Sequence, residues 1–213
     1  MQWDAIIFDC DGVLVDSERL GNEVLVECIQ PFGIRLTVEQ AMARFCGIRM
    51  ADCVAELERL RGAPLPDSFV SQFRERTAAV FADRLKAVDG ALDLLRGLTV
   101  PYCVASSGPR EKIELSLAIT GLHPYLRDRI YSAYEVGHWK PHPGLFLHAA
   151  QAMGAAPNKC AVVEDSLPGI QAGVAAGMAV FALQPAGADP RIPSDVHVVS
   201  HLQELRDVLC PKG

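Results

Sequence analysis

Residues 5–12 read AIIFDCDG, a short apolar run that ends in two carboxylates, Asp9 and Asp11, with one residue between them. A short apolar run with no polar alternation is typical of a strand buried in a parallel sheet. In open α/β sheets, binding sites form beyond the carboxyl ends of the strands. The two aspartates therefore lie where such a site is expected.

The chain that follows this strand predicts an α/β fold interrupted by an insertion. From residue 17 to about residue 80, apolar residues recur at helical spacing, and Thr37 with Gln40 has the pattern of a capping box. Apolar strands at 101–105, 129–132, 160–163, 179–183 and 196–199 then alternate with helices. This alternation predicts a parallel, Rossmann-like sheet with helices on both faces. We expect an α/β core domain of residues 1–15 and 83–213, and an inserted helical domain of residues 16–82.

Length and composition exclude several classes of protein. At roughly 150 residues per domain, 213 residues correspond to one domain, or to one domain with a large insertion. The chain has 20 Lys and Arg against 26 Asp and Glu, which argues against a non-specific nucleic-acid binder. A hydrophobic fraction of 50% with 22% charged residues excludes global disorder. No apolar run has the roughly 18 residues that a membrane span needs.

The first residues and the cysteines predict a cytoplasmic protein. The N-terminus has no basic region and places acids directly behind a very short apolar run, unlike a secretory signal. The seven cysteines are odd in number, and no two have CxxC spacing, so we expect reduced thiols. They are Cys10, Cys28, Cys46, Cys53, Cys103, Cys160 and Cys210.

Polar side chains also follow two later strands of the predicted sheet. Ser106 and Ser107 come after one strand, Glu164 and Asp165 come after another, and Lys140 lies between them. With the first two aspartates, this set provides hard oxygen ligands for a cation and an ammonium for an anion of phosphate size. Mg²⁺ takes oxygen ligands and bridges carboxylates to a substrate phosphate. An aspartate can attack phosphorus and form an aspartyl phosphate, with nearby positive charge stabilising the transferring group.

These motifs together resemble the haloacid dehalogenase (HAD) superfamily, in the branch of β-phosphoglucomutase-like and sugar-phosphate phosphatases. Residues 8–17, FDCDGVLVDS, fit the family's opening motif DxDG[TV]LxDS, and Ser106 fits the second motif. Residues 140–143, KPHP, fit the third motif, and residues 162–166, VVEDS, with Gly169 fit the fourth, EDSxxGxxAG. A lone DxD is weak evidence, but four motifs in order over nearly the whole chain are specific.

The resemblance implies the catalytic and metal-binding roles. Asp9 resembles the nucleophile. Asp11 resembles the general acid/base, which protonates the leaving alkoxide and then deprotonates the hydrolytic water. The metal ligands implied are Asp9, Asp11 through its backbone carbonyl, and Asp165, with Glu164 as a direct ligand or as a support for one. The implied cofactor is Mg²⁺.

The resemblance also implies how substrate is bound. Ser106 and the backbone N–H of Ser107 would bind phosphoryl oxygens, and Lys140 would counter their charge. The helical insertion resembles the family's cap, which closes over the site. Arg49, in the loop after the second cap helix, is a candidate anion contact, although a surface arginine at a helix start is an equal alternative. Arg44 is a weaker candidate.

Several polar residues near the motifs are expected to be structural. We expect Asp16 to lie in a turn or at a helix start, and Ser17 to cap the first helix of the insertion. Ser166 is expected to cap the helix that follows the fourth motif. His142 is expected to form a local hydrogen bond in its loop.

The expected activity is that of a Mg²⁺-dependent phosphomonoesterase acting on a small phosphorylated metabolite, such as a sugar or sugar-acid phosphate. Mutases of this branch carry a cap-linker histidine where this chain has Gly21, which favours hydrolysis. A β-phosphoglucomutase is the main alternative, and a haloacid dehalogenase or a non-catalytic binding module are weaker ones. The expected partner is the small metabolite, with no nucleic acid and no membrane, and the chain is expected to be a monomer or small homo-oligomer.

Overall fold

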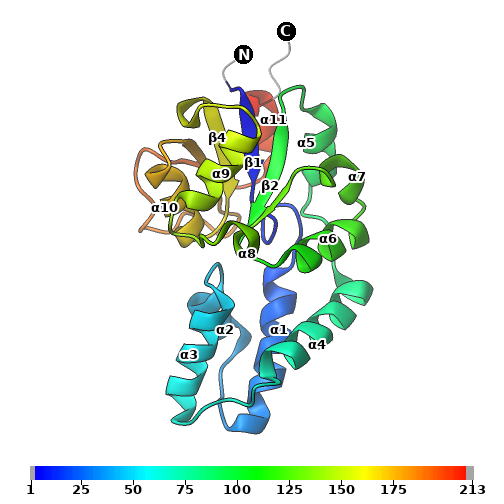
Figure 1. Cartoon of the computed structure of the whole chain (residues 1–213), viewed down its shortest axis with the longest axis vertical. Helices are drawn as coiled ribbons and strands as arrows, with labels where there is room; N and C mark the ends of the chain where they lie inside the picture. The colour runs from blue at the N-terminus through cyan, green and yellow to red at the C-terminus, as the bar shows by residue number, and fades with distance from the viewer. Residues whose placement is uncertain (1–2, 210–213) are drawn as a thin grey trace.

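One parallel sheet organises the computed structural model, which describes residues 3–209 (Figure 1). The strands follow the order β3-β2-β1-β4-β5-β6, and every neighbouring pair is parallel. The predicted parallel α/β sheet is confirmed. The strands are β1 (Ala5–Phe8), β2 (Tyr102–Ser106), β3 (Ile130–Ser132), β4 (Cys160–Glu164), β5 (Ala179–Leu183) and β6 (His197–Val199).

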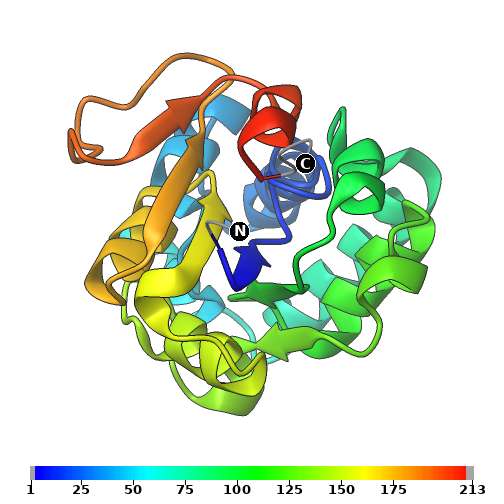
Figure 2. The ribbon, with the colours of Figure 1, turned by 90° about the horizontal axis from the view of Figure 1, so that it is seen from above.

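Helices cover both faces of this sheet (Figure 2). Successive side chains of a strand point to opposite faces. Ile6 and Phe8 of β1 accordingly pack with α5, α6 and α11, whereas Ala5 and Ile7 pack with α9 and α10. The elements around the sheet are α5 (Ala91–Gly97), α6 (Arg110–Ile119), α7 (His123–Leu126), α8 (Ala133–Val136), α9 (Gly144–Ala152), η2 (Pro157–Lys159), α10 (Leu167–Ala175) and α11 (Leu202–Leu209).

The helices between β1 and α5 form a separate layer, here called the helical unit, residues 18–84. They have their own apolar cluster, which includes Leu25, Ile29, Leu57 and Phe69. Figure 1 shows this unit at the end of the sheet where the chain leaves β1 and enters α1. The domain boundaries predicted at residues 15 and 83 stay a prediction. The elements are α1 (Glu18–Ile29), η1 (Gln30–Phe32), α2 (Val38–Phe45), α3 (Met50–Arg61) and α4 (Phe69–Arg84).

Two chain segments connect the helical unit to the sheet, and they lie side by side. Val15 forms an antiparallel bridge with Ala87, and the Asp16 N–H donates to the Lys86 carbonyl at 2.9 Å. The exposed Asp16 thus has a structural backbone role at this crossing. The chain therefore enters and leaves the helical unit at the same place, beside the end of β1.

The predicted helix caps are confirmed in two of three cases. Thr37 and Gln40 form a reciprocal capping box at the start of α2, and the Ser166 hydroxyl accepts from the Gly169 N–H at 3.2 Å. Ser17 occupies the predicted N-cap position of α1, but its side chain makes no capping bond. Its hydroxyl instead donates to the Asp11 carboxylate, because a charged acceptor forms the stronger hydrogen bond.

Six of the seven cysteines are free thiols, and five of these are buried. Cys210 lies outside the described residues. Within residues 3–209, no helix combines the length and apolar character needed to cross a membrane.

Candidate active site

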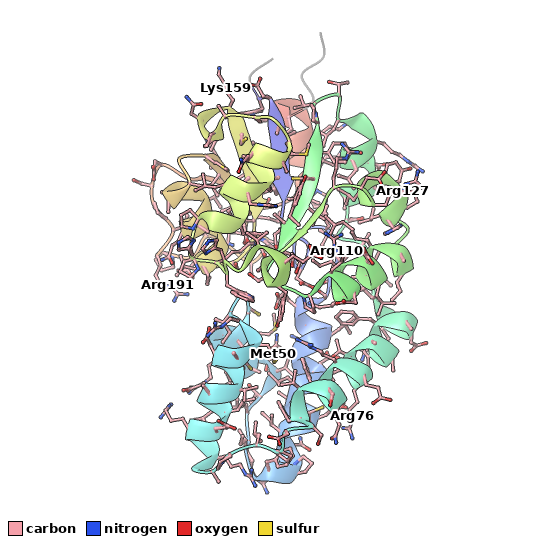
Figure 3. All side chains as sticks on the ribbon, in the orientation of Figure 1. Met50, Arg76, Arg110, Arg127, Lys159 and Arg191 are labelled. Carbon is pink, nitrogen blue, oxygen red and sulfur yellow. The ribbon has the colours of Figure 1, made fainter. Side chains whose placement is uncertain are left out.

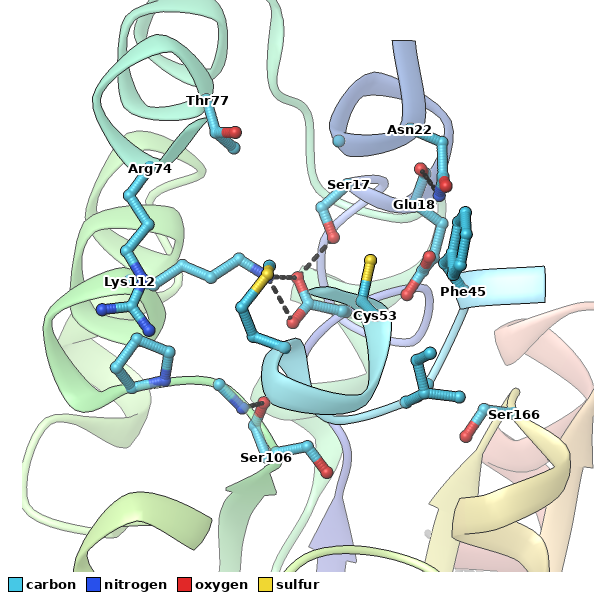
Figure 4. Close-up of a pocket in the computed structure, with 18 of the residues that line it drawn as sticks. Ser17, Glu18, Asn22, Phe45, Cys53, Arg74, Thr77, Ser106, Lys112 and Ser166 are labelled. Atoms are coloured by element: carbon cyan, nitrogen blue, oxygen red, sulfur yellow. Dashed lines mark hydrogen bonds and ion pairs between the residues drawn. The ribbon is translucent and has the colours of Figure 1, made fainter. Parts of the chain in front are cut away.

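The structure brings the motif residues together in one cavity of about 450 Å³ between the sheet and the helical unit (Figure 4). Except for Lys140, which lies in the loop before α9, they are at or just beyond the carboxyl ends of β1, β2 and β4, which are neighbours at the centre of the sheet. Their convergence therefore follows from the shared edge of parallel strands. The motif residues that line the cavity are Asp9, Asp11, Ser106, Ser107, Lys140, Glu164 and Asp165.

A buried lysine lies at the centre of this set. The Lys140 ammonium is 2.6 Å from Asp9 Oδ1 and 2.5 Å from Glu164 Oε1. Burial by itself would lower the pKa of Lys140, but the two carboxylates raise it above its usual value, so the side chain is a cation. The second oxygen of Glu164 accepts from the backbone N–H and hydroxyl of Ser166, at 2.8 and 3.0 Å. Both oxygens of Glu164 are thus occupied.

Three carboxylates lie close enough to bind one cation. Asp9, Glu164 and Asp165 each offer an oxygen, and these oxygens lie within 4.8 Å of one another. Burial raises the pKa of Asp9 to about 7, although Lys140 opposes the shift. Burial, followed by the charges of Glu164 and Glu18, raises the pKa of Asp165 well above its usual range.

The charge balance of the cavity also favours a cation. Six carboxylates but only three cationic side chains line it. A hard divalent cation would relieve the repulsion among these acids, and oxygen ligands are those that Mg²⁺ prefers. The residues present therefore fit a magnesium ion.

Asp11 lies in a different environment from the other three acids. Both of its oxygens accept from the Lys112 ammonium at 2.8 Å, and Oδ1 also accepts from the Ser17 hydroxyl at 2.5 Å. Burial would raise the pKa of Asp11, but Lys112 and Ser17 outweigh it and lower the pKa. The pKa of Lys112 is correspondingly raised to about 12, because Asp11 outweighs the effect of burial. Figure 4 draws this network.

Sequence reasoning missed Lys112. It is the third residue of α6, the helix that follows the second motif, and so lies in the first helical turn after Ser106 and Ser107. This position close to the second motif was the only indication in the sequence that Lys112 could reach the site. Its pairing with Asp11 depends on the packing of α6 beside β1.

The glycine of the first motif is required by a close approach. Gly12 has φ +74°, a conformation that other residues rarely adopt. A Cβ there would collide with the carboxylate of Asp165. Glycine thus lets the loop after β1 approach the loop after β4, and this approach is what places Asp9 beside Asp165.

Two serines that were predicted to bind phosphoryl oxygens lie at the end of β2. Ser106 is buried, and its Oγ accepts from the Gly108 N–H at 3.1 Å. The Ser107 Oγ is buried and has no hydrogen-bond partner among the described residues. Buried hydroxyls in proteins are usually hydrogen-bonded, so this one is available to an oxygen of a bound anion.

The helical unit supplies a mostly apolar wall to the cavity, with a few polar side chains. The polar contributions of the unit come from Glu18, Asn22, Arg74 and Thr77, and Ser17 lines the cavity from just before the unit. The apolar part consists of Leu25, Phe45, Ile48, Met50, Cys53, Phe73, Ala78 and Phe81, with Gly21 and Gly47.

The predicted anion contact Arg49 does not line this cavity. It pairs with Asp52 at 2.9 Å, and its guanidinium lies 5.5 Å from the ring centroid of Trp139, across the contact between the unit and the sheet domain. Its neighbour Met50 lines the cavity instead. Arg44 pairs with Glu56 at 3.1 Å and is also outside the lining.

His142 forms the local bond that was expected. Its Nδ1 accepts from the Gly144 N–H at 3.0 Å, and its ring stacks on His138 with centroids 4.3 Å apart. Neither histidine lines the cavity.

Comparisons with known proteins agree with this geometry. The family model for haloacid dehalogenase-like hydrolases matches residues 3–177. A 6-phosphogluconate phosphatase of Escherichia coli strain K12 is 35% identical, over 99% of this chain and 96% of its own. A conserved haloacid dehalogenase-like protein of Agrobacterium tumefaciens superimposes with a TM-score of 0.81 at 33% identity, covering 97% of both chains.

A second solved structure is a HAD family hydrolase from Deinococcus radiodurans with bound phosphate and sodium. It has a TM-score of 0.77 at 32% identity and covers 98% of this chain and 95% of its own. The family suggested by the four motifs is thus confirmed, and relatives over the full length include a named phosphatase. The chain belongs to the haloacid dehalogenase-like hydrolases.

Proposed function

We propose that this chain is a Mg²⁺-dependent phosphomonoesterase that hydrolyses a small phosphorylated sugar or sugar acid through an aspartyl phosphate on Asp9. The observation that carries the proposal is the cluster of Asp9, Glu164 and Asp165 within 4.8 Å, joined by the buried Lys140 at the ends of β1 and β4. The substrate class is supported by the 35% identical relative named 6-phosphogluconate phosphatase.

The metal would be held by Asp9, Asp165 and the backbone carbonyl of Asp11. Both oxygens of Glu164 are occupied by Lys140 and by the N-cap residue of α10, so we assign Glu164 to positioning Lys140. When bound, Mg²⁺ supplies positive charge that stabilises the transferring phosphoryl group.

The phosphoryl oxygens would be bound by groups at the end of β2. The unpartnered hydroxyl of Ser107 is a donor without an acceptor, and Ser106 lies beside it in the cavity lining. Lys140 supplies the charge on the other side. A phosphate placed here is within the same cavity as the Asp9 carboxylate.

The reaction then has two displacements at phosphorus. In the first, an Asp9 oxygen bonds to phosphorus, the bond to the leaving oxygen breaks, and Asp11 gives that oxygen a proton. In the second, Asp11 takes a proton from water, whose oxygen bonds to phosphorus as the bond to Asp9 breaks. Each carboxylate is regenerated, and inorganic phosphate is the product.

Asp11 must carry a proton for the first displacement, and its ion pair with Lys112 opposes protonation. A substrate phosphate offers Lys112 a second anionic partner in the same cavity. We expect this competition to loosen the hold of Lys112 on Asp11 when substrate is bound, which raises the pKa of Asp11 toward the value that a general acid needs.

The helical unit would act as a cap that excludes water from this chemistry. Two of its contacts with the sheet domain are made by arginines. Arg74 of α4 donates to the Tyr134 hydroxyl at 3.1 Å, and Arg49 lies over Trp139. Closure through these contacts would complete the wall of the cavity.

The position of Gly21 supports hydrolysis over phosphoryl transfer to a second substrate hydroxyl. Gly21 lines the cavity, and open space lies where its Cβ would be. No acid or base is therefore available at the position where mutases of this branch carry a histidine. The proposal includes a cytoplasmic location, which the six free thiols support.

The test is release of inorganic phosphate from 6-phosphogluconate and other sugar phosphates, with Mg²⁺ or with EDTA. We expect release that needs Mg²⁺, vanishes in Asp9→Asn and persists in Asp16→Asn. Asp16 is the matched control, because it is an exposed acid of the same motif outside the cavity lining. Conversion of a sugar 1-phosphate to the 6-phosphate without phosphate release would support a mutase. Silence in both assays would overturn the enzymatic proposal.

A further inference from the structure

Three cationic side chains line the cavity, and two of them are already neutralised. Lys140 pairs with two carboxylates, and Lys112 pairs with Asp11. The third, Arg74, forms no ion pair with any carboxylate in the part of the chain that the structure describes, although Glu111 lines the same cavity. Its hydrogen-bond partner is the neutral hydroxyl of Tyr134, at 3.1 Å. Arg74 is thus the one cation of this lining that no carboxylate of the described residues pairs with.

The guanidinium of Arg74 is held in place but keeps most of its donors. Arginine has five N–H donors in a planar fork, and Tyr134 accepts from only one nitrogen, Nη2. The tyrosine ring also lies under the guanidinium, with its centroid 5.7 Å from Cζ. These two contacts fix the side chain against the sheet domain while leaving an edge free for a carboxylate, which arginine binds with two parallel hydrogen bonds.

Arg74 comes from the part of the molecule that does not supply the phosphate ligands. It extends from α4 of the helical unit, whereas the phosphate ligands follow strands of the sheet (Figure 4). Its neighbours in the lining include the apolar Phe73, Ala78 and Phe81. A substrate with its phosphate at Asp9 has its remaining length within the same cavity, where Arg74 is the cation that the helical unit supplies.

We propose that Arg74 is the specificity-determining residue that binds the carboxylate of a phosphorylated sugar acid, with Tyr134 as its positioning residue. This inference rests on the proposed phosphatase function and narrows it. The substrate class is a short polyhydroxy chain with a phosphate at one end and a carboxylate at the other. A neutral sugar phosphate of the same length would leave the guanidinium without an anionic partner.

The structure favours Arg74 over Arg49 for this role. Arg49 already has the carboxylate of Asp52 at 2.9 Å, and it lies outside the cavity lining. Binding a substrate there would require that ion pair to break and the side chain to leave Trp139. Arg74 needs neither change.

The experiment compares two substrates that differ in one group. 6-Phosphogluconate and glucitol 6-phosphate are both open six-carbon chains with a terminal phosphate, but the first ends in a carboxylate and the second in a hydroxymethyl group. The wild type should prefer the acid. Arg74→Gln should lower kcat/KM for the acid by about tenfold or more, mostly through KM, and change it for glucitol 6-phosphate by less than about threefold.

Three further variants separate charge, position and residue identity. Arg74→Lys keeps the charge without the fork and should restore part of the preference. Arg76→Gln is the matched control, because Arg76 lies two residues along α4 (Figure 3), is exposed like Arg74 and does not line this cavity. It should leave the preference unchanged. Arg49→Gln tests the residue that sequence reasoning favoured and should also leave it unchanged.

The outcomes distinguish this inference from the function on which it rests. If the wild type releases phosphate from neither compound in Mg²⁺, both proposals are overturned. If it hydrolyses them but does not prefer the acid, or if Arg74→Gln lowers both activities equally, only the role of Arg74 is overturned. The same holds if Arg49→Gln or Arg76→Gln abolishes the preference instead.

Discussion

Gly47 lies at a close approach between the helical unit and the sheet domain, so Gly47→Ala tests whether that closed arrangement is the active one. A Cβ built on Gly47 would lie 2.7 Å from the Cβ of Ser166, which begins α10. Carbon atoms in contact are ordinarily about 3.5–4.0 Å apart. The variant must therefore separate the two parts by about 1 Å.

That separation has a large expected effect because the two parts supply different halves of the site. The carboxylates and Lys140 follow the strands, whereas Arg74 and the apolar wall belong to the helical unit. A misplacement of about 1 Å can cost about 100-fold in rate. We expect Gly47→Ala to lower kcat/KM for phosphate release by about 10- to 100-fold.

Gly62→Ala is the matched control. Gly62 has the same φ as Gly47, +75°, and also lies in the helical unit, but no atom lies within 4 Å of the position of its Cβ. Both variants incur the cost of a left-handed alanine, about 1–2 kcal/mol, and should lose similar thermal stability. Only Gly47→Ala should lose activity. Equal kcat/KM values for the two variants, with melting temperatures lowered alike, would refute the reasoning.

Two lysine substitutions give further predictions. Lys140→Met leaves Asp9 and Glu164 buried without their cation, which costs about 3–5 kcal/mol of folding stability. Since burial already raises the pKa of Asp9 to about 7 and Lys140 opposes that shift, the variant's Asp9 has a still higher pKa. A carboxyl with a raised pKa destabilises the folded protein increasingly as pH rises, so the variant loses more stability than the wild type at high pH. The difference in melting temperature between the variant and the wild type should therefore be smaller at about pH 5 than at about pH 8. A difference that does not change with pH would contradict this account. Lys112→Met removes the charge that lowers the pKa of Asp11, so the pH–rate profile should shift to higher pH; an unchanged profile of kcat against pH would show that Asp11 does not control it.

The sheet could be predicted from sequence because its signals are local. Each strand is a short apolar run bounded by polar or turn residues, and the expected 5–8, 160–163 and 179–183 correspond to Ala5–Phe8, Cys160–Glu164 and Ala179–Leu183. The motif residues follow those runs directly. Their meeting at one edge then follows from parallel strand geometry, so most of the candidate site could be predicted as well.

The contacts of side chains on helices could not be predicted in this way. Ser17 occupies the expected position before α1 but donates to Asp11, and Lys112 reaches the same carboxylate from α6. Nothing in their own segments shows this. Both contacts depend on how α1 and α6 pack beside the end of β1.

By itself, the sequence determined the parallel sheet, the helical insertion and the acids, serines and lysine at the strand ends. Only the tertiary structure decided which cation of the helical unit enters the cavity. Arg49 and Met50 are adjacent, yet only Met50 lines it, and Arg74 lines it from a different helix. The physical reason is that Arg49 is the extended N-cap residue of α3, whereas Met50 is its first helical residue, so the two side chains leave the backbone in different directions. Which direction faces the site is set by the rotation of each helix in its packing, and no local pattern specifies that rotation.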